Sequence, residues 1–321
     1  MSCFVAVILR EGDVQDLIEM DDIIAAVEDA MRQLGEGDAH NEPRRRAFAP
    51  GGLLNVMFAS YPNGNCTGLK AYTVSDGHVR FMVALFRLDG ALDALVEADF
   101  MGAYRTGAAT AIAARAVGTR RPSRIALIGT GWQAATQALA LTRVVEIDEM
   151  RVFSRSADKR ALFAEEQAEQ LGVPVVDAPS AEAAVRGADI VVTVTTSHAP
   201  VIDSDWVEPH AFVAAVGSNY RNRAEVPPEL VERAQTVVVD QLAAAQLESG
   251  DLIQAAEAGK FDWSEAVELG SVVSGRWERP DRPGITLFES HGIALWDLAA
   301  ASVVVAEARR RGSYEEIEFL V

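Results

Sequence analysis

The sequence predicts an α/β protein in which a Rossmann-type, doubly wound parallel sheet is joined to an α+β domain. The segment at 124–139, RIALIGTGWQAATQAL, has the pattern of a buried strand, a glycine turn and a helix. After it, apolar runs typical of buried strands alternate with segments of helical composition. Before it, short β-like runs are separated by turn signals. The two halves of the chain therefore predict two different architectures.

The glycine turn carries the fingerprint of a dinucleotide site. Gly129, Gly131 and Ala134 form G-x-G-x-x-A directly after the apolar run 125–128. The first glycine allows a sharp turn, the second lets a pyrophosphate approach the backbone, and Ala134 lets the helix pack closely on the strand. The phosphates would bind the free N–H groups at the helix N-terminus. We therefore expect a nicotinamide dinucleotide here; the alternative is a tight turn that binds nothing.

The first half contains five recognisable segments. Residues 3–9 are apolar and predict a strand, and 14–34 have a helical apolar period. Residues 41–51 form a basic stretch bounded by prolines, 52–88 contain three β-like runs, and 97–117 predict an alanine-rich helix.

The second half predicts a succession of parallel strands and helices, with a domain junction at 119–122. Strands are expected at 125–128, 150–153, 173–176, 190–194, 212–216, 236–239 and 285–288, with helices at 157–171, 227–233 and 242–258 among them. The final helix, 293–311, is long enough to return the chain to the first domain.

Composition and charge exclude several classes of protein. The 321 residues are 49% hydrophobic and 24% charged, with no apolar run long enough to span a membrane. A net charge of −18 argues against nucleic acids and anionic membrane surfaces as partners. Cys3 and Cys66 predict no disulfide framework, and neither they nor the histidines have metal spacing, so we expect no metal and a reducing cytoplasm.

The end of the second Rossmann strand indicates which dinucleotide is preferred. NAD-selective sites carry an acid there, but this strand ends in Ser154-Arg155-Ser156. Asp148 and Glu149 precede the strand and so fall at its wrong end. A guanidinium and two hydroxyls suit a 2′-phosphate, which favours NADP(H) over NAD(H). Arg155 could instead be an exposed loop residue, or stack on adenine and so accept NAD.

Five segments, in order along the chain, resemble the ornithine cyclodeaminase/mu-crystallin family. They are RTGAA at 105–109, GTGWQA at 129–134, VGSN at 216–219, ITLFES at 285–290 and DLA at 297–299. The resemblance implies a homodimer of two-domain subunits. Residues 1–118 with 299–321 would form the substrate-binding and dimerisation domain, and residues 119–298 the Rossmann domain.

The resemblance also implies the residues that bind substrate. It assigns the contacts with the substrate carboxylate to Arg44 or its neighbour Arg46, to Lys70 and to Arg105. Fixed cations suit a carboxylate, and a buried Lys70 with a lowered pKa would also protonate an imine nitrogen. The alternatives are that Lys70 extends to solvent from an edge strand, that Arg44–Arg46 form a solvated loop, and that Arg105 pairs with Glu97 or Asp99.

Cofactor contacts follow from the same motifs. The expected set is Arg105, Thr106, Gly129, Gly131, Trp132, Gln133, Ser154, Arg155, Ser156, Thr195 and Ser290. Trp132 is expected to form a wall of the cleft, and Glu289 could be a simple surface acid.

Asn219 decides between the activities that the family contains. Cyclodeaminases have an aspartate at this position, and a carboxamide cannot carry a proton at neutral pH. Where they have lysine, this chain has Arg223. We therefore expect an NAD(P)H-dependent reductase of an imino acid or cyclic ketimine, reversible as an amino-acid dehydrogenase, that acts on an imino or keto acid and an amine. In it Lys70 and Asn219 are the catalytic residues, although Asn219 could simply fix the loop. The alternatives are a cyclodeaminase-type lyase with bound NAD and a non-catalytic binding protein like mu-crystallin.

Overall fold

Each half of the chain builds its own sheet in the computed structural model, which describes residues 3–119, 123–282 and 284–320. The chain divides into two compact units, unit 1 (Met1–Arg105 with Ile293–Val321) and unit 2 (Thr106–Gly292).

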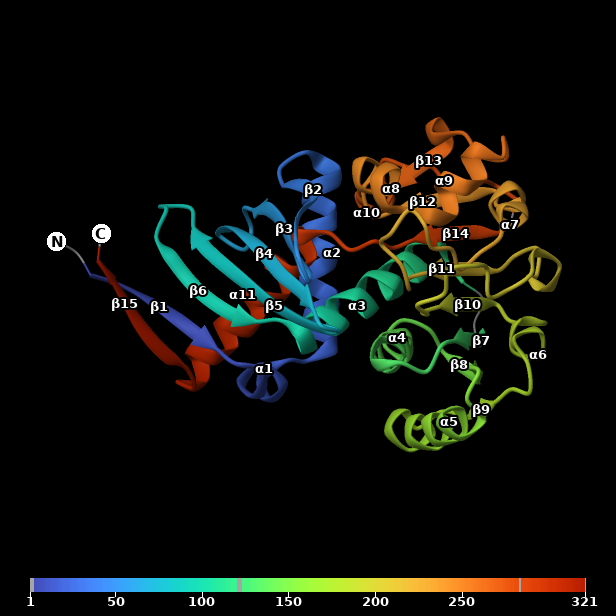
Figure 1. Cartoon of the computed structure of the whole chain (residues 1–321), viewed down its shortest axis with the longest axis horizontal. Helices are drawn as coiled ribbons and strands as arrows, with labels where there is room; N and C mark the ends of the chain where they lie inside the picture. Colours follow the sequence, from blue (N-terminus) through green and yellow to red (C-terminus); the bar gives the residue numbers. More distant parts are fainter. Residues whose placement is uncertain (1–2, 120–122, 283, 321) are drawn as a thin grey trace. The chain divides into compact units, whose positions relative to one another are not determined.

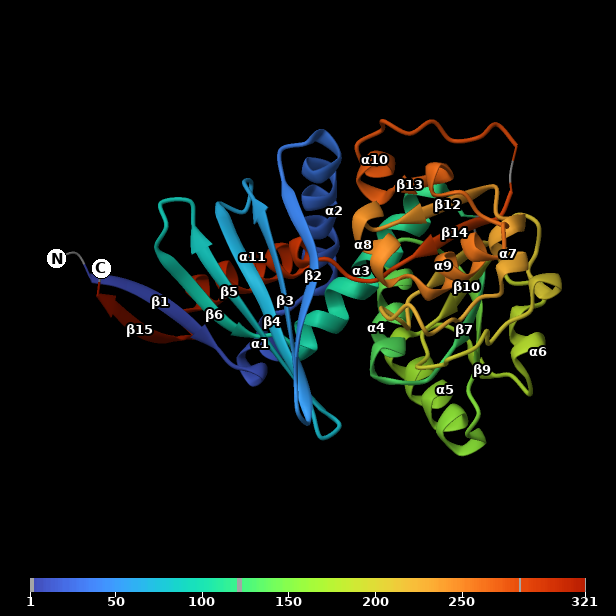
Figure 2. The same ribbon diagram turned by 45° about the horizontal axis from the view of Figure 1, so that its top comes forward.

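Unit 1 is a seven-stranded sheet with helices against one face. Its elements are β1 (Cys3–Leu9), α1 (Glu11–Leu17), α2 (Met20–Glu36), β2 (His40–Ala49), β3 (Gly52–Tyr61), β4 (Cys66–Ser75), β5 (His78–Arg87), β6 (Leu92–Glu97), the start of α3 (Asp99–Val117), α11 (Ala294–Arg311) and β15 (Glu315–Leu320). The strand order is β15-β1-β6-β5-β4-β3-β2, antiparallel except for the β1–β6 pair. Helix α11 packs on β3, β4 and β5, and α2 packs on α11 (Figure 2).

Two segments of unit 1 differ from the sequence analysis. The proline-bounded basic stretch, for which no element was predicted, is strand β2, whose register against β3 shifts between Glu42 and Arg45. That irregularity contains Pro43, which has no N–H to donate to the sheet, so the bulge lets the proline sit within the strand. The helix expected at 14–34 is two helices, because Ile18 is extended and buried between α1 and α2.

Two further strands of unit 1 were not predicted. They are β6, after the last β-like run, and β15, at the C-terminal end of the chain. Strand β15 pairs with β1, more than 300 residues away in sequence, and the two run side by side in Figure 1. No local pattern carries information about such a distant partner.

The division between the units falls within helix α3 rather than at the predicted junction, and residues 120–122 of that junction lie outside the described residues. A Cβ on Gly107 would come within 2.5 Å of the carbonyl oxygen of Thr136, in α4 (Trp132–Thr142). The second part of α3 therefore packs directly on the backbone of a unit 2 helix, which places the boundary earlier than 118. The return of the chain to unit 1 begins at Ile293, not at 299.

Unit 2 is the predicted Rossmann fold, with an eight-stranded, all-parallel sheet. After α3 and β7 (Ser123–Ile128) come α4, β8 (Ile147–Phe153), α5 (Ala157–Leu171), β9 (Val175–Asp177), α6 (Ala181–Val185), β10 (Ile190–Thr193), η1 (Ser204–Trp206), β11 (Phe212–Ala215), α7 (Pro228–Arg233), β12 (Thr236–Val239), α8 (Leu242–Glu248), α9 (Gly250–Glu257), η2 (Trp263–Glu265), β13 (Ala266–Glu268), α10 (Leu269–Val273) and β14 (Thr286–Glu289). Strand β13 was not predicted.

The strand order of unit 2 places a ligand site at the ends of β7 and β10. The order is β13-β12-β14-β11-β10-β7-β8-β9, so the chain runs outward from β7 in one direction and then crosses to β10 on its other side. Open parallel sheets bind ligands at this switch point, beyond the carboxyl ends of the strands.

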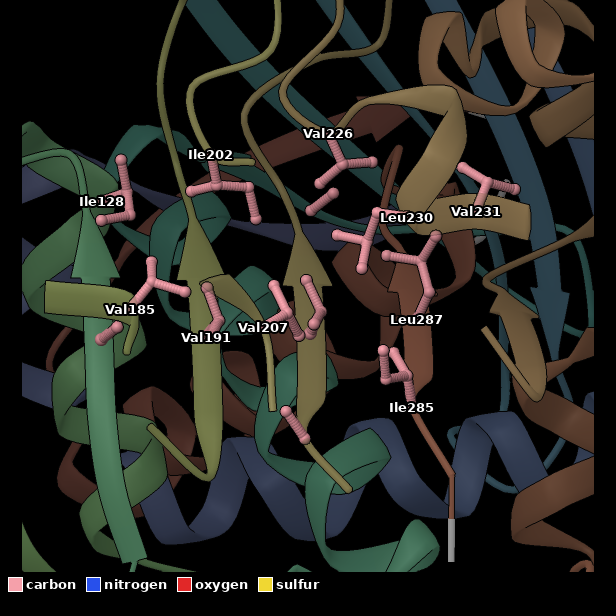
Figure 3. Packing of buried hydrophobic residues seen from close by; sticks show 14 of the residues in the cluster. Ile128, Val185, Val191, Ile202, Val207, Val226, Leu230, Val231, Ile285 and Leu287 are labelled. Atoms are coloured by element: carbon pink, nitrogen blue, oxygen red, sulfur yellow. The ribbon is translucent and has the colours of Figure 1, made fainter. Parts of the chain in front are cut away.

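An apolar layer covers one face of this sheet. Ile128, Val191 and Leu287 project from three strands onto residues of the covering segments, including Val185 of α6 and Leu230 of α7 (Figure 3). In the order of the sheet, these three strands are β7, β10 and β14. This packing holds the strand ends that carry the site. No helix of the described residues is long and apolar enough to cross a bilayer.

Candidate functional site

The turn after β7 requires glycine at its first position. Gly129 has φ +121°, a conformation that L side chains rarely adopt. A Cβ there would lie 2.4 Å from the carbonyl oxygen of Val194, which follows the neighbouring strand β10. Gly129 therefore serves both the turn and the close approach of two adjacent strand ends.

Gly131 has a different role, because it faces open space. It is the N-cap residue of α4 with ordinary extended dihedral angles, and a Cβ on it would meet no atom within 4 Å. No side chain caps this helix N-terminus, and a helix N-terminus is a favourable place for an anion. Ala134 is fully buried where the helix packs on the sheet. This arrangement fits the pyrophosphate of a dinucleotide.

A pocket of about 600 Å³ lies at the switch point of the sheet. It is lined by Ile128, Gly129, Thr130, Gly131, Phe153, Ser154, Arg155, Val194, Thr195, Thr196, Ser197, His198 and Val201. Five of the predicted cofactor residues are therefore brought together: Gly129, Gly131, Ser154, Arg155 and Thr195. Thr196, Ser197 and His198 were not predicted, since they stand in a loop whose sequence has no fingerprint of its own. Thr130 was not predicted either, because it is the variable residue between the two glycines of the fingerprint.

Other predicted cofactor residues do not line this pocket. Trp132 is 55% exposed at the first turn of α4, and Gln133 beside it is also exposed. Ser156 is the N-cap of α5 and accepts the backbone N–H of Lys159 at 3.4 Å. Thr106 is buried in α3 within unit 2.

No carboxylate lines the pocket at the end of β8. Thr130 donates its hydroxyl to Ser154 at 2.9 Å, and the Arg155 side chain is exposed beside it. The acids at the start of β8 have partners at that opposite end: Asp148 lies 3.6 Å from Arg124, and the Glu149 carboxylate accepts a hydrogen bond from Arg151. The pocket therefore presents a cation and hydroxyls where an NAD-selective fold presents an acid.

A buried glutamate, Glu225, forms hydrogen bonds with the loops that follow β10 and β11. Its carboxylate accepts the backbone N–H of Thr195 at 2.5 Å, that of Gly217 at 2.6 Å and the hydroxyl of Thr193 at 3.1 Å. A Cβ on Gly217 would come within 2.5 Å of the same carboxylate, so glycine is needed there. Burial raises the pKa of Glu225 to about 7.

Further acids extend this network behind the strand ends. Asp251 accepts the backbone N–H groups of Glu225 and Val226 at 2.7 and 2.8 Å, and Glu289 accepts the hydroxyl of Ser249 at 3.1 Å. Burial raises the pKa of both Asp251 and Glu289. The interpretation of Glu289 as a surface acid was wrong, because strand β14 is interior and its last side chain points into the protein.

The residues after β11 and β14 complete the candidate site in unit 2. Asn219 is half-buried in the loop after β11. Ser290 is buried directly after β14, and its hydroxyl has no hydrogen-bond partner among the described residues. A buried hydroxyl without a partner is costly, so it fits a ligand contact at this strand end. Within the described residues, no cluster of histidine, cysteine, aspartate and glutamate could hold a metal ion.

Lys70 is fully enclosed in unit 1. It stands in the middle of β4 between Met57 and Val83 of the neighbouring strands, and it is 2% exposed. Its ammonium lies 2.7 Å from Oδ1 of Asp297 and 4.8 Å from the centre of the Phe81 ring. The alternative of a lysine that extends to solvent was therefore wrong.

Arg105 shares the same carboxylate. Its Nε donates to Oδ1 of Asp297 at 3.1 Å, and its guanidinium lies 5.7 Å from the Trp296 ring centre. The partner found for Arg105 is therefore neither Glu97 nor Asp99. Asp297 belongs to the DLA motif, but the sequence did not indicate it as a partner of Arg105, because the two residues are 192 positions apart.

The basic stretch contributes Arg44 and Arg46 from β2. Arg44 is buried, 5.9 Å from the Tyr72 ring centre, and Arg46 is half-buried in register with Asn55 of β3. Because they belong to a strand, the alternative of a solvated loop was wrong. Lys70, Arg105 and Arg44 form a cationic cluster, in which Lys70 and Arg105 share the carboxylate of Asp297. Burial lowers the pKa of Lys70 to about 8, and the nearby Arg105 and Arg44 lower it as well.

Comparison with known proteins agrees with this geometry. A sequence model of the ornithine cyclodeaminase/mu-crystallin family matches residues 5–312. A Delta(1)-pyrroline-2-carboxylate reductase of Bacillus cereus is 34% identical over 228 residues, which are 70% of each chain. The structure of the Thermococcus litoralis Delta(1)-pyrroline-2-carboxylate reductase in complex with NADH and L-proline has a TM-score of 0.90 and 30% identity, and the match covers 97% of this chain and 100% of that one.

A second solved relative belongs to a different activity class. An archaeal alanine dehydrogenase dimer with bound NAD has a TM-score of 0.91 and 30% identity, and the match covers 99% of this chain and 100% of that one. The likeness extends through both units, and the family model covers nearly the whole sequence. The chain is therefore a member of the ornithine cyclodeaminase/mu-crystallin family.

Proposed function

We propose that this protein is an NAD(P)H-dependent reductase of the carbon–nitrogen double bond of an imino acid or cyclic ketimine. In the reverse direction it is an amino-acid dehydrogenase. The observation that carries the proposal is that two buried cations, Lys70 and Arg105, share one oxygen of the Asp297 carboxylate, an arrangement that suits an anionic ligand. The relatives named above include reductases of a cyclic imino acid and an alanine dehydrogenase.

The residues of unit 1 bind the substrate in this proposal. Arg44 and Arg105 hold its carboxylate, with Arg46 beside them on β2. Lys70 donates a proton to the imine nitrogen; with a pKa of about 8 it holds that proton at neutral pH yet releases it readily.

The residues of unit 2 bind the dinucleotide, which when bound supplies the hydride for the imine carbon. The loop from Gly129 to Gly131 and the N-terminus of α4 hold its pyrophosphate, and Thr195 and Ser290 contact it near the strand ends. Asn219 orients the substrate by hydrogen bonds and carries no proton. Hydride to carbon and a proton to nitrogen give the amino acid.

NADP(H) is the preferred dinucleotide in this proposal. The pocket presents Arg155 and the hydroxyls of Thr130 and Ser154 at the end of β8, and no acid lines it. A guanidinium matches the geometry of a 2′-phosphate, whereas an acid would repel it.

A homodimer is the proposed assembly, formed through the face of the unit 1 sheet that α11 leaves uncovered. Leu54, Phe58 and Met82 project from β3 and β5 on that face, and each is at least 40% exposed. Such an apolar sheet face is typical of a protein interface, and the archaeal relative is a dimer. A second copy of this chain is therefore its proposed occupant.

An assay of nicotinamide absorbance tests the activity. The purified protein would be mixed with NADPH or NADH and with 1-pyrroline-2-carboxylate, 1-piperideine-2-carboxylate, or 2-oxo acids plus ammonia or methylamine. Oxidation of the dinucleotide that requires an imine is the expected result. No oxidation with any of them, but formation of proline and ammonia from ornithine with catalytic NAD, would overturn the proposal in favour of the lyase.

A further inference from the structure

Asp297 stands in the first turn of helix α11, in the middle of the cationic cluster. The backbone N–H of Leu295 donates to the side chain of Asn41 at 3.1 Å, and the indole of Trp296 contacts the sulfur of Met31 at 2.9 Å. These contacts attach the first turn of α11 to β2 and α2. Because a helix N-terminus stabilises negative charge, the carboxylate of Asp297 is well placed there as an anion.

One oxygen of this carboxylate serves both cations. Oδ1 accepts from Nζ of Lys70 at 2.7 Å and from Nε of Arg105 at 3.1 Å, and Asp297 is fully buried. The Lys70 ammonium is therefore directed by a buried carboxylate, whose other oxygen, Oδ2, has no hydrogen-bond partner among the described residues. Nη1 of Arg105 has no hydrogen-bond partner among the described residues, so this arginine keeps donor capacity beyond Asp297.

The charges around Lys70 act in opposite directions on its proton. Burial lowers the pKa of Lys70, Asp297 raises it, and the neighbouring Arg105 and Arg44 lower it. Asp297 is therefore the carboxylate that favours the protonated form of Lys70. Without it, the buried ammonium would lose the carboxylate that pairs with it and would lie beside the guanidinium of Arg105.

We infer that Asp297 is a positioning residue for proton transfer: it aims the Lys70 ammonium and keeps it protonated while Arg105 is held ready for the substrate carboxylate. This inference rests on the proposed function only for the use that catalysis makes of Lys70. The arrangement of Asp297 and Lys70 can be measured without any substrate.

The first test measures the protonation of Lys70 directly. The chain has three lysines, Lys70, Lys159 and Lys260, so a protein labelled with [¹³C]lysine gives three Cε signals in an NMR titration. The signal that is absent from the spectrum of Lys70→Met belongs to Lys70. We expect the Lys70 signal to titrate near pH 8 in the wild type and at least one pH unit lower in Asp297→Asn. The same midpoint in both proteins would overturn the inference, whatever the enzyme reduces.

The second test measures catalysis. In Asp297→Asn, we expect the rate of imine reduction at pH 7.5 to fall at least tenfold. The alkaline limb of the plot of kcat against pH should move to lower pH by at least one unit. At a pH below this new limb, the rate should be partly recovered. A merely structural role would lower the rate without moving the limb, and that result would also contradict the inference. Asp297→Glu restores the charge and should return the limb toward its wild-type position.

Matched variants keep the test interpretable. Asp93→Asn removes a different ion-paired aspartate of unit 1, which is partly buried and pairs with Arg309 at 2.9 Å. This variant should move neither the NMR midpoint of Lys70 nor the alkaline limb of kcat. If Asp297→Asn does not fold, Asp297→Ser is a smaller neutral replacement for the same two measurements. A moved midpoint together with no imine reduction in the wild type would uphold the role of Asp297 toward Lys70 and reject the proposed function.

Discussion

The carboxylate of Glu225 accepts the backbone N–H of Thr195 at 2.5 Å, so a side chain from a distant loop holds the end of strand β10. It also holds Gly217 after β11, and the loop with Asn219 begins there. One buried acid therefore sets the spacing of two loops to which we assign cofactor and substrate contacts.

Replacing Glu225 with glutamine should destabilise unit 2. An amide cannot accept from all three donors that the carboxylate serves, and a buried donor left without a partner costs about 1–3 kcal/mol. We expect the free energy of unfolding in urea to fall by an amount in that range. Glu229→Gln, an exposed acid on α7 that pairs with Lys260, is the control and should unfold like the wild type. Equal stability of the two variants would contradict the role of Glu225.

The two glycines of the fingerprint should respond differently to alanine. Gly129→Ala introduces a Cβ at positive φ and against the carbonyl of Val194, so unfolding should become easier by about 3 kcal/mol or more. Gly131→Ala meets no atom, so its stability should equal that of the wild type, while its Kd for NADPH rises by about tenfold or more because the methyl group occupies the place of the pyrophosphate. Unfolding curves and fluorescence titrations measure both. Tight NADPH binding by Gly131→Ala would contradict the assignment of the loop.

Replacing Arg155 with serine should change the choice of dinucleotide. Loss of a guanidinium that pairs with a 2′-phosphate should raise KM for NADPH by about tenfold or more and leave KM for NADH almost unchanged. Arg124→Ser removes an exposed arginine that lies near Asp148, at the other end of the parallel strands, and should change neither value. A wild-type preference for NADH would itself reject the assignment of Arg155.

The two directions of the reaction should depend oppositely on pH. Burial lowers the pKa of Lys70 to about 8, so the protonated form needed for reduction is lost as the pH rises through that value. The neutral form needed to accept a proton in amino-acid oxidation appears over the same interval. We expect kcat for reduction to fall and kcat for oxidation to rise around pH 8. Lys70→Arg cannot titrate there, and an unchanged limb in that variant would assign the titration to another group.

The assembly can be tested by a single charge on the sheet face. Phe58→Glu should shift the molar mass from dimer to monomer in light scattering after gel filtration, because a charge at this position cannot be buried without a partner. Leu162→Glu changes an equally exposed apolar residue on α5 of unit 2 and should leave the mass unchanged. A monomeric wild type would reject the dimer.

The sequence alone determined those features whose conformation depends only on residues that are neighbours along the chain. The strand, glycine turn and helix around Gly129 were predicted from sixteen consecutive residues, 124–139, because backbone conformation and helix packing there depend on local sterics. The alternation of buried strands and helices similarly predicted a mostly parallel, doubly wound sheet, and the observed sheet is parallel throughout. The lack of an acid after β8 could be read directly from Ser154 and its neighbours.

Only the tertiary structure decided which charged side chains of the candidate site are buried and which of them pair with one another. Strand β2 exists because β3 offers it a pairing edge, and β15 exists because β1 does. Asp297 faces Lys70 across 227 positions, and Glu225 faces Thr195 across 30. The sequence marks each of these acids only as an acid. Whether an acid is solvated or compensates a buried cation depends on which distant elements pack around it, and folding alone determines that.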